Sequence, residues 1–440
     1  MEEYLIVNAN VLTFGFKNRY IADAAIHIGR GVILDFGTRK EMEIKHPTLE
    51  KLDMGGKVVM PGFVDLHNHL YSGFFQNMPI ELGSVKNYNE FMNKFWWKLT
   101  DKLSSDGIFY SAVKGIIKAI KSGTTTIFNL HSSPNCIDDS LNDVADAFLD
   151  TGMRGVIAYE ISNRKGEKDA EKMFEVNANF VTQNASNSLI NGMIGLYNVN
   201  EVSDALLTKI SNFGKKTGCG LMLHLSETGT EDDYSIAKFK KYTIDRLNDH
   251  GLLNAKTLLV GANNLDEYEA DVLVRTEANV VLTPSSSLYK SFEFPPIDLY
   301  VDKNIPLSFG TDGIFHSISG EADFANRLFK QHLNTFDRGN KEVSNILMNT
   351  NYKIANKFVS RVIGEIKPGA AADLIAVDYH PEIEINDENL YTHLMFGILQ
   401  SRIDTTIVDG KVLMKDYKLV ELDIDDILEH CKTFANDFNR

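Results

Sequence analysis

Apolar runs that end in polar residues alternate with helical patterns through the middle of the chain. In residues 104–121, for example, apolar side chains recur at steps of three and four, the spacing of one helix face. Ser104 or Ser105 can cap the start of this helix and Gly123 its end. The strand-like runs span 61–69, 124–131, 155–162, 193–199, 220–227, 257–264, 280–287 and 306–312. Eight such units predict an α/β fold, the (β/α)8 TIM barrel, whose chemistry lies at the carboxyl ends of the strands.

Both ends of the chain show a different pattern, in which short apolar runs alternate with glycine-containing turns. This pattern is typical of small antiparallel β structure, and Asp409-Gly410 between two apolar runs is a hairpin signal. Because terminal segments often lie close together, residues 1–60 and 364–420 are predicted to form one small β-sandwich domain. Residues 61–363 would then form the barrel, and residues 421–440 a C-terminal helix.

The composition of the chain indicates which kinds of partner the protein can bind and in which compartment it works. The 440 residues carry a formal charge of -15, which argues against nucleic acid and anionic membranes because both require a basic surface. The N-terminus lacks a basic segment followed by an apolar one, and no apolar run reaches membrane-spanning length. Cys136, Cys219 and Cys431 are few and scattered, which indicates a reducing compartment. We expect a cytoplasmic protein that acts on a small molecule.

The stretch 61–69 follows the apolar residues Val58-Val59-Met60 and predicts a buried strand that carries two histidines. Successive side chains of a strand alternate between its faces, so His67 and His69 point the same way. Imidazole is a common ligand for divalent transition metals, and the pair therefore predicts half of a metal site. The alternative is a pair of core histidines that donate to backbone carbonyls.

Two further strand ends carry candidate ligands. His224 ends one apolar run, and Asp312 stands in Gly310-Thr311-Asp312-Gly313 at the end of the last. Three imidazoles and a carboxylate form a metal set that leaves room for water, and such a metal lowers the pKa of that water toward neutrality. Asp312 could also accept the proton, and Glu227 could pass it to a leaving nitrogen. The alternative for Glu227 is an exposed loop acid.

These motifs, in this order, resemble the amidohydrolase superfamily, and specifically its deaminase branch that acts on cyclic amidines. The segments 93–99, 131–134 and 159–164 are similar to those of the aminohydrolases of the SsnA type, and the likeness extends over nearly the whole chain. The resemblance implies a zinc hydrolase, with Fe²⁺ as a second candidate, in which His67, His69, His224 and Asp312 bind the metal. It also implies a homodimer. The fourth strand offers no lysine for a second metal, so one ion per subunit is favoured.

The chain departs from the deaminase pattern at two positions. Gly261 stands where the branch carries a histidine at the end of the sixth strand, and Tyr197 stands where it carries one at the fourth. A group that polarises the substrate is worth orders of magnitude in rate, so another donor is needed. The residues predicted to contact substrate are Trp96, His131, Tyr197, Asn263, Asn264, Ser286 and His316.

Two functions remain open from the sequence. The first is a metal-dependent hydrolase that attacks a C–N bond of a nitrogen heterocycle or a related amide. The second is a non-catalytic or divergent paralog that keeps the metal and the fold as a binding or assembly subunit. Gly261 and Tyr197 favour the second, and retention of Glu227 favours the first. A third interpretation, a glycine-loop nucleotide binder, is weak, because no phosphate-loop signature or dinucleotide fingerprint follows a strand.

Overall fold

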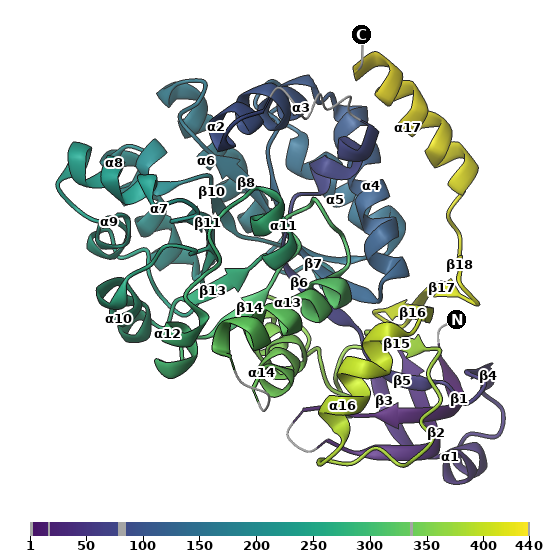
Figure 1. Cartoon of the computed structure of the whole chain (residues 1–440). Coiled ribbons are helices and arrows are strands. Elements are labelled where there is room, and N and C mark those ends of the chain that lie inside the picture. Colours follow the sequence, from purple (N-terminus) through teal and green to yellow (C-terminus); the bar gives the residue numbers. More distant parts are fainter. Residues whose placement is uncertain (1–2, 16–17, 78–84, 335–337, 439–440) are drawn as a thin grey trace.

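The structure is a computed structural model, and it describes residues 3–15, 18–77, 85–334 and 338–438 (Figure 1). Parallel strands in the order β14-β13-β12-β11-β10-β8-β7-β6 form the barrel, and β9 pairs with β8. This arrangement confirms the predicted fold class. The barrel strands are β6 (Phe63–Asn68), β7 (Thr124–His131), β8 (Arg154–Ile161), β9 (Ile190–Gly192), β10 (Ile194–Leu196), β11 (Leu221–Leu225), β12 (Thr257–Gly261), β13 (Asn279–Leu282) and β14 (Leu307–Phe309).

Helices follow the barrel strands and cover the outside of the ring (Figure 1). As predicted, the Ser104 hydroxyl caps α4 by accepting from the Gly107 N–H, and Gly123 follows its end with a φ of +81°. A π-helical turn, Met92–Trp96, joins α2 and α3. The helices are α2 (Tyr88–Phe91), α3 (Trp97–Lys102), α4 (Ser105–Lys121), α5 (Ser140–Thr151), α6 (Glu167–Gln183), α7 (Asp204–Thr217), α8 (Thr230–Phe239), α9 (Thr243–Asp249), α10 (Glu267–Thr276), α11 (Pro284–Tyr289), α12 (Ile297–Asp302), α13 (Ile318–Leu333), α14 (Asn340–Asn345) and α15 (Asn351–Ala355).

A second sheet combines strands from both ends of the chain, in the order β18-β17-β16-β15-β5-β1-β2-β3, with β4 paired to β1. Figure 1 shows its purple and yellow strands side by side below the barrel. The division at residues 60, 363 and 420 stays a prediction. The elements are β1 (Glu3–Leu12), β2 (Tyr20–Gly29), β3 (Val32–Thr38), α1 (Arg39–Lys45), β4 (Glu50–Asp53), β5 (Val58–Pro61), β15 (Leu374–Val377), α16 (Leu390–Phe396), β16 (Ile403–Val408), β17 (Lys411–Lys415), β18 (Lys418–Leu419) and α17 (Ile424–Phe438).

Gly62 separates two strands, whereas the sequence pattern placed both Pro61 and Gly62 inside the predicted strand 61–69. β5 belongs to the terminal sheet, where it pairs with β15, and β6 belongs to the barrel. A Cβ atom on Gly62 would lie 2.1 Å from the Thr125 Cγ2 atom, so only glycine fits at this crossing. The chain therefore passes at Gly62 directly from the terminal sheet into β6, which carries His67 and is followed by His69.

A hydrogen-bonded seam joins the first and last barrel strands. The N–H groups of Thr311 and Asp312 both donate to the His67 carbonyl, at 2.9 and 3.0 Å. The buried Asp65 carboxylate accepts from the Thr311 N–H and, at 2.6 Å, from the Thr311 hydroxyl. Asp312 itself has a φ of +56°, a left-handed conformation that is costly for a residue other than glycine. Closure of the ring therefore fixes the backbone of His67 and of Asp312 together.

Arg154 connects the barrel to the terminal sheet. Its guanidinium, fully buried at the start of β8, forms two hydrogen bonds to the Asp373 carboxylate at 2.7 and 3.0 Å. It also donates to the Asp409 carboxylate at 3.1 Å and to the Ser188 carbonyl at 2.6 Å. Among the helices that the structure describes, none combines the length and the apolar character that a membrane span requires.

Candidate active site

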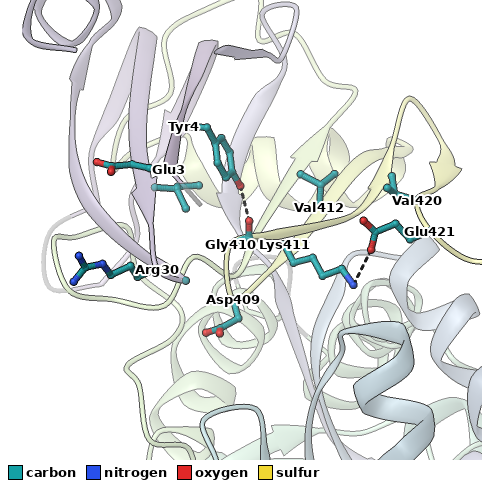
Figure 2. A pocket seen from close by; sticks show the side chains of 11 residues that line it. Glu3, Tyr4, Arg30, Asp409, Gly410, Lys411, Val412, Val420 and Glu421 are labelled. Atoms are coloured by element: carbon teal, nitrogen blue, oxygen red, sulfur yellow. Dashed lines mark hydrogen bonds and ion pairs between the residues drawn. The ribbon is translucent and has the colours of Figure 1, made fainter. Parts of the chain in front are cut away.

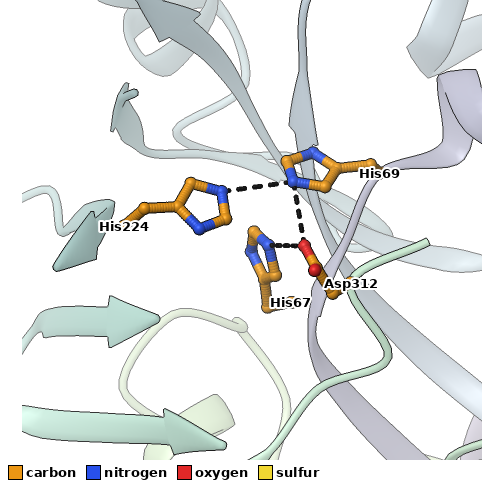
Figure 3. Close-up of side chains that lie close together, drawn as sticks. All are labelled: His67, His69, His224 and Asp312. Atoms are coloured by element: carbon orange, nitrogen blue, oxygen red, sulfur yellow. Dashed lines mark hydrogen bonds and ion pairs between the residues drawn. The ribbon is translucent and has the colours of Figure 1, made fainter. Parts of the chain in front are cut away.

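Four buried side chains converge at the carboxyl ends of the barrel strands. His67 is the penultimate residue of β6 and His69 follows the strand, while His224 lies in β11 and Asp312 follows β14. Their ligand atoms all lie within 4.8 Å of one another, and Figure 3 shows the three imidazoles and the carboxylate turned toward a common centre. The sequence predicted these four residues as neighbours, and the barrel brings them together.

The outer nitrogen of each imidazole is held by a neighbouring group. The His69 Nδ1 atom lies 2.7 Å from the Leu130 carbonyl, which can only accept, so this nitrogen carries the proton. The His224 Nδ1 atom lies 3.2 Å from the Glu227 carboxylate, and the His67 Nδ1 atom lies 3.1 Å from the Met222 sulfur. This arrangement turns the three Nε2 atoms inward, as in histidines that bind a metal.

The inner nitrogen atoms are too close together to be satisfied by one another. The His69 and His224 Nε2 atoms lie 3.2 Å apart, and the Asp312 Oδ1 atom lies 3.1 Å from the Nε2 atoms of both His67 and His69. Two facing lone pairs require a proton or a metal cation between them. Burial lowers the pKa of His67 to about 3, which keeps that ring neutral and able to bind a metal. The donor set therefore fits one divalent ion such as Zn²⁺ or Fe²⁺.

Lys290, which the sequence analysis missed, lies in the same site. Its buried ammonium contacts the Asp312 Oδ2 atom, and the Ser286 hydroxyl donates to that oxygen at 2.5 Å. The Lys290 Nζ atom also lies 3.9 Å from a Glu227 oxygen. Ser286 and Lys290 are four residues apart at the end of α11, so helical spacing was the signal that could have found the lysine.

The opposite charges of the lysine, the carboxylates and the histidines shift one another's pKa values toward the charged forms. Burial alone would lower the pKa of Lys290, but the carboxylates of Asp312 and Glu227 raise it, so the ammonium stays charged. Burial alone would raise the pKa of Asp312, but Lys290 and the histidines hold it well below its usual range. Burial would likewise lower the pKa of His224, whereas the charge of Glu227 raises it to about 8. The site is thus a balanced cluster of opposite charges.

Gly261 and Tyr197 occupy the positions where the sequence departs from the deaminase pattern. Gly261 has a φ of +87°, and a Cβ atom on it would lie 2.8 Å from the Glu227 Cγ atom. The Glu227 side chain therefore packs over Gly261, and a histidine there would need both a strained backbone and a displaced Glu227. The Tyr197 ring centroid lies 6.3 Å from that of His224. Tyr88, also missed because it lies in the insertion after β6, places its hydroxyl 3.5 Å from Glu227.

Three residues predicted to contact substrate support the backbone or lie behind the metal set. The carboxamides of Asn263 and Asn264 donate to the Glu227 carbonyl at 3.3 and 3.2 Å, so they fix the turn that carries Glu227. The buried His316 imidazole has its Nδ1 atom 3.4 Å from the Asn68 amide and packs toward α4, where a Cβ on Gly115 would lie 3.4 Å from it.

Two others lie beside the metal set. The Trp96 ring centroid lies 5.9 Å from that of His69, and its indole N–H donates to the Tyr71 hydroxyl at 2.7 Å. The buried His131 ring lies 6.0 Å from the Tyr71 ring. Tyr71, Trp96 and Tyr197 therefore form an aromatic wall around the three imidazoles.

A cavity of about 680 Å³ lies elsewhere, in the terminal sheet (Figure 2). None of its lining residues belongs to the metal set. Two pairs of its lining residues interact with each other, through the Lys411–Glu421 ion pair at 2.9 Å and the bond from the Tyr4 hydroxyl to the Gly410 carbonyl, also 2.9 Å. The chemistry of the cluster in Figure 3 therefore has no counterpart in this cavity.

Comparison with known proteins places the chain in a family. Residues 58–413 match the Amidohydrolase family, which covers most of the chain. The chain belongs to the amidohydrolase family. This amidohydrolase is 26% identical to a 5-methylthioadenosine/S-adenosylhomocysteine deaminase of Caldanaerobacter subterraneus over 84% of each protein. It is 25% identical to a 5'-deoxyadenosine deaminase of Methanosarcina mazei over 99% of this chain and 98% of that one.

A solved structure shares the amidohydrolase fold along the full length. It is an adenosine deaminase from Xanthomonas campestris with bound zinc, which superposes with a TM-score of 0.87 at 18% identity. The superposition covers 99% of this chain and 98% of that one. The likeness includes the terminal sheet as well as the barrel.

Proposed function

We propose that this protein is a metal-dependent hydrolase that breaks a C–N bond of a nitrogen heterocycle or a related amide, in the manner of a deaminase. The observation that carries the proposal is the convergence of four buried ligand atoms within 4.8 Å, with the three Nε2 atoms turned inward. His67, His69, His224 and Asp312 would bind one Zn²⁺ per subunit, with Fe²⁺ as the second candidate. A metal held there lowers the pKa of water and supplies a hydroxide nucleophile near neutral pH.

The two carboxylates would divide the proton transfers. The Asp312 Oδ1 atom faces His67 and His69, while its Oδ2 atom accepts from Ser286 and Lys290. This carboxylate is therefore fixed and ionised, and it would orient the attacking water. Glu227, which has an oxygen 3.9 Å from the same Lys290 Nζ atom, would carry the proton to the departing nitrogen.

Lys290 would supply the donor that Gly261 cannot. Negative charge develops on the heterocycle when the nucleophile adds, and a buried ammonium aimed at that charge stabilises the transition state. The Lys290 Nζ atom lies beside both Asp312 and Glu227, so it reaches the region where the reacting carbon would lie. Tyr88 and Tyr197 are the nearby phenols that could assist it.

The names of the relatives suggest where the substrate search begins. Those relatives are named as deaminases of adenosine-type compounds, and they match 84% and 99% of the chain at 26% and 25% identity. Amino-substituted purines and their nucleosides are therefore the first class to test, followed by aminopyrimidines and cyclic amides. A non-catalytic paralog is not favoured, because such a protein would have no use for the ionised Glu227 and Lys290 beside the ligands.

Metal analysis and a turnover screen test the proposal together. We expect about one zinc or iron ion per subunit and release of ammonia from at least one aminated heterocycle. His224→Ala is expected to abolish both, whereas His380→Ala, which changes an exposed histidine, leaves both intact. Purified protein that binds no metal, or that retains turnover after His224→Ala, would contradict the proposal. A homodimer and a cytoplasmic location stay predictions of the sequence.

A further inference from the structure

A cavity of about 300 Å³ lies at the amino ends of β10 and β11, away from the proposed metal set. The last turns of α7 and the segment between α9 and β12 form its other walls. Leu221, which lines it, begins β11, and His224 lies toward the other end of that strand. The cavity and the metal set are therefore separate sites. Its aliphatic lining residues are Ile194, Ile210, Leu221 and Leu252.

Glycine residues keep this cavity open. A Cβ atom on Gly214 or Gly218, which both line it, would meet nothing within 4 Å. At Gly251 a Cβ atom would lie 3.5 Å from the Lys215 Nζ atom and 3.8 Å from the Ser211 Oγ atom. The absence of a side chain at Gly251 therefore leaves a cradle that an ammonium and a hydroxyl both border.

The Ser211 hydroxyl is a buried polar group without a protein partner. The residue is 5% exposed, and its Oγ atom has no hydrogen-bond partner among the described residues. Native proteins seldom leave a buried hydroxyl unpaired, because the group loses its bonds to water and gains none in return. Since the hydroxyl hydrogen rotates freely about the C–O bond, Ser211 can donate to an acceptor placed in the cradle.

The charged side chains of the cavity are both cationic. Lys256 donates to the Gly218 carbonyl at 2.8 Å, which leaves two of its three N–H groups for a ligand. Lys215 forms no hydrogen bond or ion pair within the part of the chain that the structure describes. Among the described residues, no aspartate or glutamate lines the cavity, although the whole chain carries a formal charge of -15. The lining therefore favours an anion.

We propose that this cavity binds a small carboxylate with a compact apolar body, such as an aryl or branched-chain carboxylate. Lys215 and Ser211 would donate to the carboxylate in the cradle beside Gly251, and Lys256 would add a second positive charge. The aliphatic side chains would pack against the apolar body, as in other small-molecule sites. This inference goes beyond the proposed function, because the site lies away from the metal set and takes no part in the reaction.

Alkylation of Cys219 tests the site locally, because this partly exposed thiol lines the same cavity. Cys136, which is also partly exposed but follows β7, serves as the internal control. Peptide mass spectrometry of the full-length protein would follow alkylation of both thiols by iodoacetamide in the presence of benzoate or of benzamide, its neutral counterpart. We expect benzoate to protect Cys219 at a concentration at least about fivefold lower than benzamide, the size of one ion pair with an exposed lysine. Neither compound is expected to protect Cys136.

A matched pair of lysine variants assigns the preference to the cavity. Lys215→Met is expected to remove the preference for benzoate, whereas Lys216→Met, which removes the neighbouring exposed charge of α7 outside the cavity, is expected to keep it. Equal protection of Cys219 by the two compounds in the wild-type protein would overturn the site, and so would a preference that survives Lys215→Met or protection that extends to Cys136. Metal binding and turnover are measured independently, so an active enzyme without protection of Cys219 would lose this site and keep the proposed function. A metal-free, inactive protein that shows the preference would do the reverse.

Discussion

Lys290 places a buried positive charge between two carboxylates at the centre of the site. Its contact with Asp312 and its position 3.9 Å from Glu227 give the site a permanent cation on the side that lacks the sixth-strand histidine. The Glu227 side chain fills the space over Gly261, so the lysine reaches the site from α11 instead. A donor is therefore present in the site although Gly261 has no side chain to supply one.

We predict that Lys290→Met lowers kcat by about a hundredfold or more, the usual cost of losing a group that stabilises developing charge. Metal content is expected to persist, because the four ligands remain. Lys290→Arg, which keeps the charge, is expected to retain part of the activity. Steady-state kinetics and metal analysis provide the measurement, with Lys303→Met, which removes an ion pair with Asp271, as the control. Undiminished kcat in Lys290→Met would show that another group acts as the donor.

Prediction from sequence succeeded for residues that a local motif carries. His67 and His69 are two apart on a strand, and Asp312 stands between glycines at a strand end, so their positions followed from the alternation of the chain. Lys290 could not be placed in the same way, because its contact with Asp312 depends on how α11 is oriented. Asn263 and Asn264 have the right residue type, yet their amides are engaged by the Glu227 carbonyl, which only the folded turn reveals.

At the scale of elements, α13 positions α11. The Glu321 carboxylate of α13 accepts the Ser285 N–H at the start of α11 at 2.9 Å, and the next residue, Ser286, holds Asp312. Burial raises the pKa of Glu321 to about 8. The folded protein therefore keeps a proton on this carboxyl at pH values where the unfolded chain, with an ordinary glutamate pKa, has lost it.

This difference predicts how stability depends on pH. Between the ordinary glutamate pKa and about 8, the unfolded state binds fewer protons at this group than the folded state, so the contribution of Glu321 weakens as pH rises. Glu321→Gln keeps an acceptor for Ser285 but cannot ionise. We expect its thermal midpoint, relative to that of the wild type, to be higher at pH 8 than at pH 5. The exposed Glu175→Gln serves as the control, and an equal offset at both pH values would contradict the assignment.

Arg154 links the two sheets at the scale of the whole molecule. Its guanidinium binds Asp373 and Asp409, two carboxylates that the terminal sheet contributes, from the start of a barrel strand. This end of the barrel is opposite to the end that carries the metal set, since β8 begins at Arg154 and reaches Glu160 near its other end. The ion pairs that link the two sheets and the proposed metal ligands therefore lie at opposite ends of the barrel.

We predict that Arg154→Met destabilises the protein by about 3–5 kcal/mol, because it leaves a buried carboxylate without its partner. Chemical denaturation provides the measurement. Arg327→Met, which removes an exposed pair with Asp323, is expected to have little effect. Folded Arg154→Met protein is expected to keep its metal, because the four ligands lie at the other end of the strands. A denaturation curve that coincides with that of the wild type would show that the linkage contributes nothing.

The seam between the first and last barrel strands also determines the order in which the protein can mature. His67 and Asp312 are 245 residues apart along the chain, yet they share both a backbone bond and a coordination centre. During translation, a nascent chain that has only reached the seventh strand has three imidazoles and no carboxylate to complete them. Ion uptake is then a late event that depends on ring closure, and the fraction of molecules loaded with metal reports how many barrels have closed.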